Sequence, residues 1–318
     1  MVSKTRLGSE ASISELTIYH IPKDERNGVM NYRITTDSTC DLPKQFYLDR
    51  DIKIIGLSFL LDGQEYKEGF DLKISSKEFY DQLRAGKQSS TMQVNTFEFT
   101  EFIEPFLAAG EDVLHIAFSS GLSGTYDSCR RGAEELALKY PDRKLIVVDS
   151  LAASMGEGLL TYYADKNRQS GMSLEDNAAW LENNKLHLCH WFTVNDLMHL
   201  HRGGRVSKTS AIMGSILGIK PVLHVDDEGH LILMSKVRGR GAAIDALVNK
   251  LKETANENIA DQMIFISHGD CLDEANLLAD KLRNTVGVKN IMISDIGAVI
   301  GSHSGPGTIA MFFLGKQR

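Results

Sequence analysis

The chain has 318 residues, of which 42% are hydrophobic and 24% are charged. No stretch approaches the roughly 20 apolar residues of a membrane span, so we expect no integral membrane segment. The formal net charge of −7 argues against broad nucleic-acid binding, because neutralising phosphates requires a basic face. A chain of this length is expected to form two domains.

The cysteines indicate a reducing compartment. They form no CxxC pair, and no histidine lies at zinc-finger spacing from them, so we expect neither a disulfide framework nor a metal site. Free cysteines are typical of a reducing compartment, so we expect a cytoplasmic location. The four cysteines are Cys40, Cys129, Cys189 and Cys271.

The first 29 residues are mixed in charge and lack the continuous apolar run of a signal peptide. We interpret residues 1–29 as an N-terminal extension, because Met30 opens directly onto a strand-like segment. The alternative is a helix over Ile13 to Ile21 that packs on the domain, since its apolar residues are partly periodic.

Short runs rich in branched residues alternate with amphipathic segments along the chain. One such segment is 96–109, where aromatic and aliphatic residues recur at three- and four-residue spacing and form one helical face. Alternation of strand and helix predicts parallel α/β layering. The expected strands are Tyr32 to Thr36, Ile52 to Leu61, Asp112 to Phe118, Lys144 to Val148, Leu186 to Val194, Met263 to Ser267 and Asn290 to Ser294.

Residues 221–236 break this pattern, because they alternate around Asp227, Glu228 and Gly229 as an antiparallel hairpin does. The polar stretch 170–185 is the expected domain boundary. The sequence therefore predicts two α/β domains. Residues 30–180 form a parallel-sheet N-terminal domain, and residues 181–318 form a C-terminal α/β domain with an added antiparallel hairpin.

The segment Phe118 to Tyr126, FSSGLSGTY, follows a buried strand and precedes a helix. Ligands of open α/β sheets bind at such turns. Gly121 and Gly124 permit a close backbone approach, and the helix start favours an anion. The bland alternative is that the serines only cap the helix. The hydroxyls of the turn come from Ser119, Ser120, Ser123 and Thr125.

Three further small, polar turns occur along the chain. They are DSTCDL at 37–42, SSTMQ at 89–93 and SHSGPG at 302–307. Each has an ordinary explanation alone, as a helix cap, a loop, or a histidine satisfied by backbone. Four such turns in one chain together indicate a ligand site.

These turns, in this order, resemble the signature of the DegV family, from about Met30 to the C-terminus. RGGRVS at 202–207 and LGIKPV at 217–222 also resemble family segments. The resemblance implies two α/β domains with a fatty acid buried between them. Met92 and Val94 depart from the family, whose loop usually carries serine and proline there.

The resemblance also implies which residues hold the carboxylate of the acid. Thr91 and Ser120 are expected to bond it, with Ser90 and Ser119 as adjacent alternatives and His303 as a neighbour. A tunnel of adaptable apolar residues is expected for the tail, although ordinary core packing is an alternative for each. Further pocket or turn residues are Asp37, Ser38, Gly121, Ser123 and Gly124, and tunnel candidates are Met155, Leu159, Met213, Ile216 and Leu217.

Arg202 and Arg205 flank a Gly-Gly turn and are expected to form a positive partner surface. The resemblance implies a dihydroxyacetone-kinase-like fatty acid kinase as the partner, which would phosphorylate the bound acid to an acyl phosphate. The alternative is a solvated face or an internal ion pair.

The chain is expected to be a carrier and no enzyme, with no cofactor and only the bound acid as ligand. The competing hypothesis is a serine hydrolase or acyltransferase, with Ser120 as nucleophile, His303 as base and Asp37 as orienting group. The sequence lacks the G-x-S-x-G elbow of one large hydrolase class. A site for a phosphorylated metabolite at the glycine-serine turn is a third and weaker reading.

Overall fold

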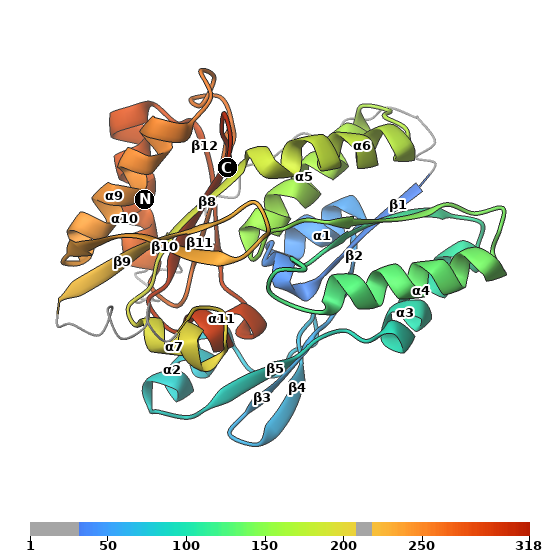
Figure 1. Ribbon diagram of the computed structural model, residues 1–318, viewed down its shortest axis with the longest axis horizontal. Coiled ribbons are helices and arrows are strands. Elements are labelled where there is room, and N and C mark those ends of the chain that lie inside the picture. Colours follow the sequence, from blue (N-terminus) through green and yellow to red (C-terminus); the bar gives the residue numbers. More distant parts are fainter. Residues whose placement is uncertain (1–31, 208–217) are drawn as a thin grey trace, which may run out of the picture.

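The computed structural model describes residues 32–207 and 218–318, and its element order is shown in Figure 1. The predicted extension 1–29 and the tunnel candidates Met213, Ile216 and Leu217 lie outside these residues. The first sheet is fully parallel, in the order β2-β1-β6-β7. Its strands are β1 (Tyr32–Asp37), β2 (Lys53–Ile55), β6 (Asp112–Ala117) and β7 (Leu145–Asp149).

Helices cover both faces of this sheet, as the alternating pattern predicts (Figure 1). The helices α3 and α4 pack against one face, whereas α5 and α6 pack against the other. Residues 170–185, the predicted boundary, contain α6 and lead into the second domain. The helices around this sheet are α1 (Lys44–Arg50), α3 (Thr96–Ala108), α4 (Thr125–Lys139), α5 (Met155–Gln169) and α6 (Leu174–Asn184).

A small antiparallel sheet, β4-β3-β5, was not predicted. It comprises β3 (Ser58–Leu61), β4 (Gln64–Lys67) and β5 (Ser89–Met92), with α2 (Ser76–Arg84) between the last two. The expected single strand over 52–61 is wrong, because the chain leaves the parallel sheet at Gly56. A Cβ on Gly56 would overlap the carbonyl oxygen of Glu68, so glycine is required there.

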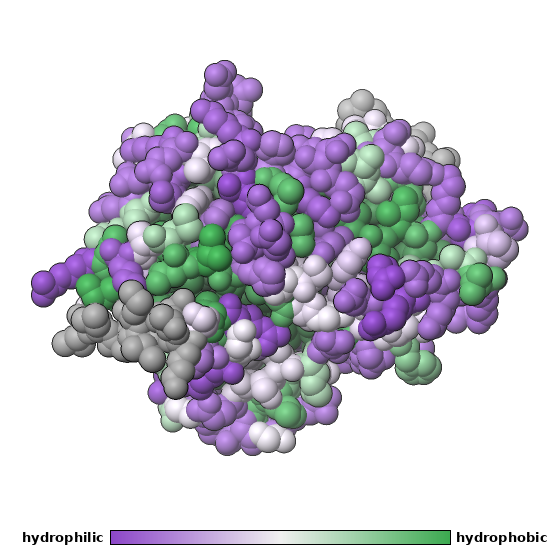
Figure 2. Space-filling model, viewed as in Figure 1, coloured by the Kyte–Doolittle hydropathy of each residue, from purple (hydrophilic) through white to green (hydrophobic). Residues whose placement is uncertain are grey.

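The C-terminal sheet has six strands in the order β10-β9-β8-β13-β11-β12. The predicted hairpin is confirmed as β9 and β10, while β13 was missed and runs antiparallel between β8 and β11. Figure 2 shows apolar side chains gathered over β9 and β10. The strands are β8 (Leu188–Thr193), β9 (Ile219–Val225), β10 (Leu231–Arg238), β11 (Met263–His268), β12 (Asn290–Asp295) and β13 (Ile309–Leu314).

The two faces of this sheet contact different helices. The helices α9 (Arg240–Thr254) and α10 (Leu272–Val286) cover one face, whereas α5 packs on the other. One apolar cluster consequently runs from β1 and β6 through α5 to β8 and β13. Among the described residues, no helix is long and apolar enough to cross a bilayer.

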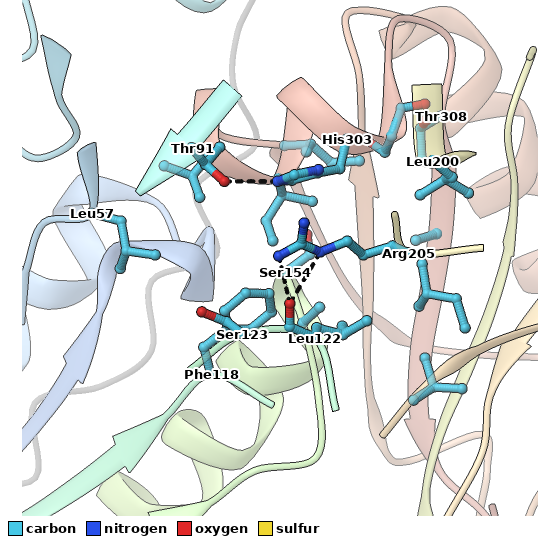
Figure 3. Close-up of a pocket in the computed structure, with 18 of the residues that line it drawn as sticks. Leu57, Thr91, Phe118, Leu122, Ser123, Ser154, Leu200, Arg205, His303 and Thr308 are labelled. Atoms are coloured by element: carbon cyan, nitrogen blue, oxygen red, sulfur yellow. Dashed lines mark hydrogen bonds between the residues drawn. The ribbon is translucent and has the colours of Figure 1, made fainter. Parts of the chain in front are cut away.

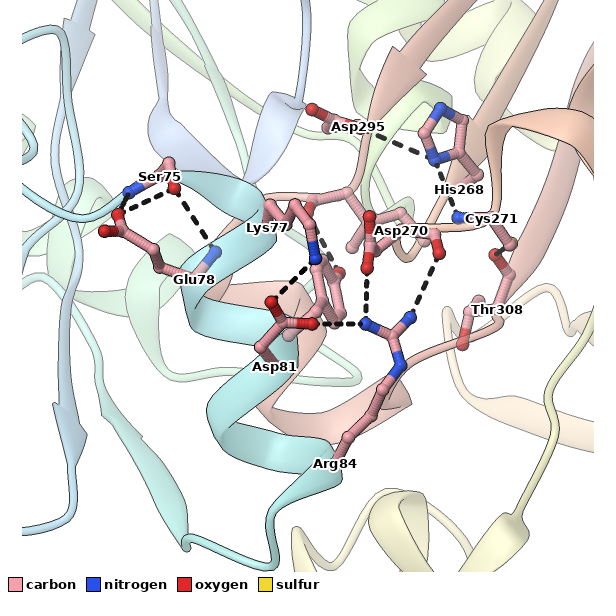
Figure 4. Close-up of polar contacts among 12 residues, drawn as sticks. Ser75, Lys77, Glu78, Asp81, Arg84, His268, Asp270, Cys271, Asp295 and Thr308 are labelled. Carbon is pink, nitrogen blue, oxygen red and sulfur yellow. Dashed lines mark hydrogen bonds and ion pairs between the residues drawn. The ribbon is translucent and has the colours of Figure 1, made fainter.

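Helix α2 anchors the small sheet to the C-terminal domain. Figure 4 shows the guanidinium of Arg84 bonded to both the carboxylate and the carbonyl oxygen of Asp270. On the buried side of the helix, the Tyr80 hydroxyl donates to the Ile296 carbonyl at 3.0 Å. Ser75 and Glu78 close the start of the helix as a capping box. The small sheet is therefore fixed beside the second domain.

Buried carboxyl groups connect the strand ends around the site. Asp37 accepts hydrogen bonds from the amides of Thr39 and Phe118, at 3.0 and 2.9 Å. Glu157 on α5 accepts from the hydroxyls of Thr36 and Thr39, at 2.7 and 2.9 Å. Burial raises the pKa of Asp37 to about 6 and that of Glu157 well above its ordinary value.

A second buried pair holds the start of α11 (Ala298–Ser304). Asp41 accepts from the Ser154 hydroxyl at 2.6 Å and from the Gly297 amide at 2.9 Å. Glu68 accepts from the Val299 amide at 3.2 Å. Burial raises the pKa of Glu68 to about 7. These contacts fix the helix that carries His303 against the first domain.

We predict that Glu68→Gln reduces the pH dependence of stability. A folded-state pKa of about 7, above the ordinary 4.5, gives stability that is complete below pH 4.5 and is lost as the pH rises through about 7. Between about pH 5 and about pH 8, the melting temperature of the wild type should therefore fall relative to that of the variant. Thermal melts across this range measure the effect.

Glu65→Gln is the matched control, because Glu65 lies on β4, three residues before Glu68, and its side chain is exposed. Its melting curve should follow that of the wild type at each pH. If the melting temperatures of the wild type and of Glu68→Gln changed equally with pH, the raised pKa of Glu68 would be contradicted.

Candidate functional site

A cavity of about 430 Å³ lies where the small sheet, the end of the parallel sheet and the open face of the six-stranded sheet meet. Figure 3 shows side chains from all three converging on it. One part of its wall is polar and the rest is apolar. The polar and charged lining residues are Thr91, Gln93, Ser123, Ser154, His190, Arg205, His303, Ser304 and Thr308.

Thr91 and His303 form a hydrogen-bonded pair at the polar part. The Thr91 hydroxyl lies 2.8 Å from Nε2 of His303 (Figure 3). Burial, with a smaller effect of the Arg205 charge, lowers the pKa of His303 to about 4, so the imidazole is neutral at pH 7. Gly203 packs against the other ring nitrogen, and a Cβ there would overlap it.

Arg205 provides a fixed positive charge inside the cavity. Its Nε and Nη2 donate to the Leu122 carbonyl at 3.1 and 2.7 Å, and Nη1 donates to the Gly203 carbonyl. Figure 3 shows the guanidinium between His303 and Leu122. This position corrects the expectation that Arg205 belongs to an outer partner surface. Arg202, in contrast, is exposed and contacts His199 at 3.0 Å.

The glycine-serine turn presents a different serine from the one expected. Ser123 and Gly124 line the cavity. Ser119 is fully buried, and its hydroxyl donates to the Gly229 carbonyl at 3.0 Å. Ser120 is exposed, and its amide donates to Asp149 at 3.2 Å. Of the turn's serines, Ser123 is therefore the one placed to meet a ligand in this cavity.

The remaining predicted residues make structural contacts around the cavity or lie at the surface. Ser38 accepts a hydrogen bond from the Leu57 amide at 3.0 Å. Gly121 packs against the hairpin turn at 228–229, where a Cβ would overlap backbone atoms. Ser90 is exposed and alternates with Thr91 on β5. Asp37 contacts backbone and Thr39, as described above.

The predicted catalytic triad does not assemble. Within the described residues, Asp37, Ser120 and His303 share no hydrogen bond, since His303 bonds Thr91 and Asp37 bonds Thr39 and Phe118. A nucleophile requires a base within hydrogen-bond reach. The geometry gives no support to hydrolysis through these residues.

The apolar lining of the cavity comes partly from one face of the six-stranded sheet and partly from the turns and helices beside it. The tunnel candidates Met155 and Leu159 are fully buried and belong to the shared core cluster, outside this wall. Such an elongated apolar wall beside a polar cluster suits an amphiphile. The apolar lining residues include Leu57, Phe118, Leu122, Phe192, Leu200, Val225, Leu231, Val299, Ile300, Ala310 and Phe312.

A second cavity of about 330 Å³ adjoins the polar part. It shares Thr91, Arg205 and His303 with the first cavity, and it adds the basic residues Lys87 and Arg202. This second cavity, the vestibule, thus places two basic side chains beside the polar part of the first, although Lys87 is also paired with Asp62 at 2.9 Å.

Sequence reasoning missed two features of the polar cluster. Arg205 was recognised as basic, but its approach to the FSSGLSGTY turn depends on a contact across 83 residues. Gln93 lines the cavity because its side-chain oxygen packs against Gly124, where a Cβ would overlap it. The sequence signal that could have indicated this contact is Gly124, a glycine at the start of a helix beside a serine-rich turn.

Comparisons with known proteins agree with this architecture. A DegV domain-containing protein of Clostridium perfringens is 47% identical over 286 residues, covering 90% of this chain and 98% of the relative. A DegV lipid-binding protein of Thermotoga maritima has a TM-score of 0.79 at 30% identity, with 91% of this chain and 99% of that one covered.

A DegV family protein of Thermus thermophilus, described by its fatty acid binding, has a TM-score of 0.80 at 29% identity. The comparison covers 89% of this chain and 98% of that one. The family profile described as "uncharacterised protein, DegV family" matches residues 31–316. The chain therefore belongs to the DegV family.

Proposed function

We propose that this chain binds one long-chain fatty acid, with its carboxylate at the polar cluster and its tail along the apolar wall. The observation that carries the proposal is a single cavity of about 430 Å³ that combines a fixed cation, Arg205, with a mostly apolar lining. Ser123 and Thr91 add hydroxyl groups beside that cation. In this proposal Ser123 takes the role first expected for Ser120.

The energetics favour such a ligand. Each buried methylene of a tail contributes about 0.8 kcal/mol, so the tail supplies much of the affinity. A buried carboxylate is costly unless it is paired and hydrogen-bonded. Arg205 supplies the charge, and because its Nε and Nη2 are fixed by Leu122, little side-chain entropy remains to be lost on binding.

The relatives support the same class of ligand. Solved DegV proteins with TM-scores of 0.79 and 0.80 are described as lipid-binding and fatty-acid-binding. We propose a carrier that has no catalytic residue of its own and no cofactor besides the bound acid. The hydrolase hypothesis has no supporting observation in the geometry of Ser120.

We further propose that the carrier presents its acid to a fatty acid kinase that forms an acyl phosphate. The vestibule supports this step, because it joins the headgroup cluster to exposed basic residues, Lys87 and Arg202. An acidic face of a kinase would find complementary charge there. Arg202 is thereby assigned to partner binding and Arg205 to the headgroup.

We predict that Arg205→Met weakens fatty acid binding at least about tenfold, because hydrogen bonds to a charged group contribute about 1.5–3 kcal/mol. Wild-type protein purified from a bacterial host should contain extractable fatty acid, and the variant should contain less. Mass spectrometry of solvent extracts and titration of delipidated protein measure both quantities.

Arg131→Met is the matched control for Arg205→Met, because Arg131 is exposed on α4. It should retain wild-type affinity. Wild-type protein that contains no lipid and binds none would overturn the proposed function.

We predict that Ser123→Ala lowers affinity several-fold, whereas Ser120→Ala leaves it unchanged. Ser123 lines the cavity, while Ser120 faces solvent. A lost hydrogen bond to a charged headgroup accounts for the expected size. Binding titrations of the two variants decide between the residues. A loss confined to Ser120→Ala would place the headgroup on the other side of the turn.

We predict that Arg202→Ala slows phosphorylation of the bound acid by a purified dihydroxyacetone-kinase-like fatty acid kinase, without changing lipid content. The reason is that rim charges act mainly on association. The slowing should shrink as the salt concentration rises. Equal rates for the variant and the wild type at low salt would argue against this surface.

A further inference from the structure

One polar side chain lies within the apolar wall of the cavity. His190 and Phe192 on β8 stand opposite Phe312 and Ala310 on β13, so all four project from the same face of the sheet. All four line the cavity. His190 is the one member of this group that can form side-chain hydrogen bonds.

The hydrogen-bonding capacity of His190 is unused. The residue is 1% exposed, and neither ring nitrogen has a partner among the described residues. The neighbouring His224, by contrast, uses Nδ1 to contact the His190 carbonyl at 3.0 Å. A buried imidazole without a partner is uncommon, because its desolvation is not repaid.

The surrounding residues hold the ring in place without satisfying it. Phe312 contacts it edge to face, with centroids 5.6 Å apart. Gly156 at the start of α5 lies against Nε2 and Cδ2 of the ring, where a Cβ would overlap it. Burial lowers the pKa of His190 well below its ordinary value, so the ring is neutral and offers one donor and one acceptor.

The distance along the sheet places His190 well away from the headgroup. Thr308 directly precedes β13, and its hydroxyl donates to the carbonyl of Ser304, the neighbour of His303. Phe312 lies four residues further on, so at a rise of about 3.4 Å per residue the separation is about 14 Å. At ordinary bond lengths and angles an extended hydrocarbon advances about 1.25 Å per bond. A chain that follows β13 therefore reaches His190 after about eleven bonds.

We propose that His190 is a specificity-determining residue for a fatty acid that carries a hydroxyl group in the middle of its chain, about ten to twelve carbons from the carboxyl group. This inference rests on the proposed fatty-acid binding and names the ligand class. A hydroxyl can donate to the unprotonated ring nitrogen or accept from the protonated one, so it can pair with whichever nitrogen faces the tail. An unsubstituted tail leaves both nitrogens unpaired.

The test is competitive binding to delipidated full-length protein. The probes are stearic acid, 10-hydroxystearic acid, 12-hydroxystearic acid and 2-hydroxystearic acid. Wild-type protein should bind the 10- or 12-hydroxy acid roughly tenfold more tightly than stearic acid. The 2-hydroxy acid should show no such gain, because its hydroxyl lies at the headgroup.

Variants assign the preference to His190. His190→Leu should bind stearic acid at least as well as the wild type and lose the preference for the mid-chain hydroxyl. His190→Gln retains a donor and an acceptor and should keep part of that preference. Thermal melts and stearic acid binding report whether each variant is folded.

The outcomes separate this inference from the proposed function. Tight binding of stearic acid with no preference for a mid-chain hydroxyl, or a preference that survives in His190→Leu, overturns the role of His190 alone. A preference for a mid-chain double bond over a hydroxyl also overturns it. Failure to bind any of the acids overturns both.

Discussion

The site depends on one electrostatic constraint, the cost of taking a carboxylate out of water. A cavity with a mostly apolar lining cannot hold a charge unless a cation and donors are fixed beside it. Arg205 meets this need because the Leu122 carbonyl orients its guanidinium from across the turn. In the proposed function, Thr91, Ser123 and neutral His303 complete the cluster around the carboxylate.

Several backbone features exist to bring that cluster together. Gly203 makes room for the His303 ring, and Gly124 makes room for Gln93. The buried acids Asp41 and Glu68 tie the start of α11 to the first domain and thereby place His303 opposite Thr91. Burial raises the pKa of both acids, so keeping them ionised inside the fold costs free energy. Their hydrogen bonds to the start of α11 align the two halves of the molecule.

Local signals predicted much of the fold, since branched runs and the Asp227 to Gly229 turn identified both halves and the hairpin. They failed at Gly56, where a tertiary contact with Glu68 splits one apolar run between two sheets. They also missed β13, whose apolar residues lack alternation because both sheet faces are buried. Of the residues that line the cavity, Thr91, Ser123 and His303 were expected from motifs, whereas the positions of Arg205 and His190 depend on long-range packing that no local pattern records.

The most direct test of the ionic headgroup site is carbon-13 NMR of a carboxyl-labelled palmitic acid bound to the protein, followed as a function of pH. Paired with Arg205, the carboxyl group should remain ionised and titrate at a lower pKa than the same acid free in water. A bound carboxyl group that titrates above the pKa of the free acid, as burial without a cation causes, or at the value of a solvent-exposed acid, would contradict this account.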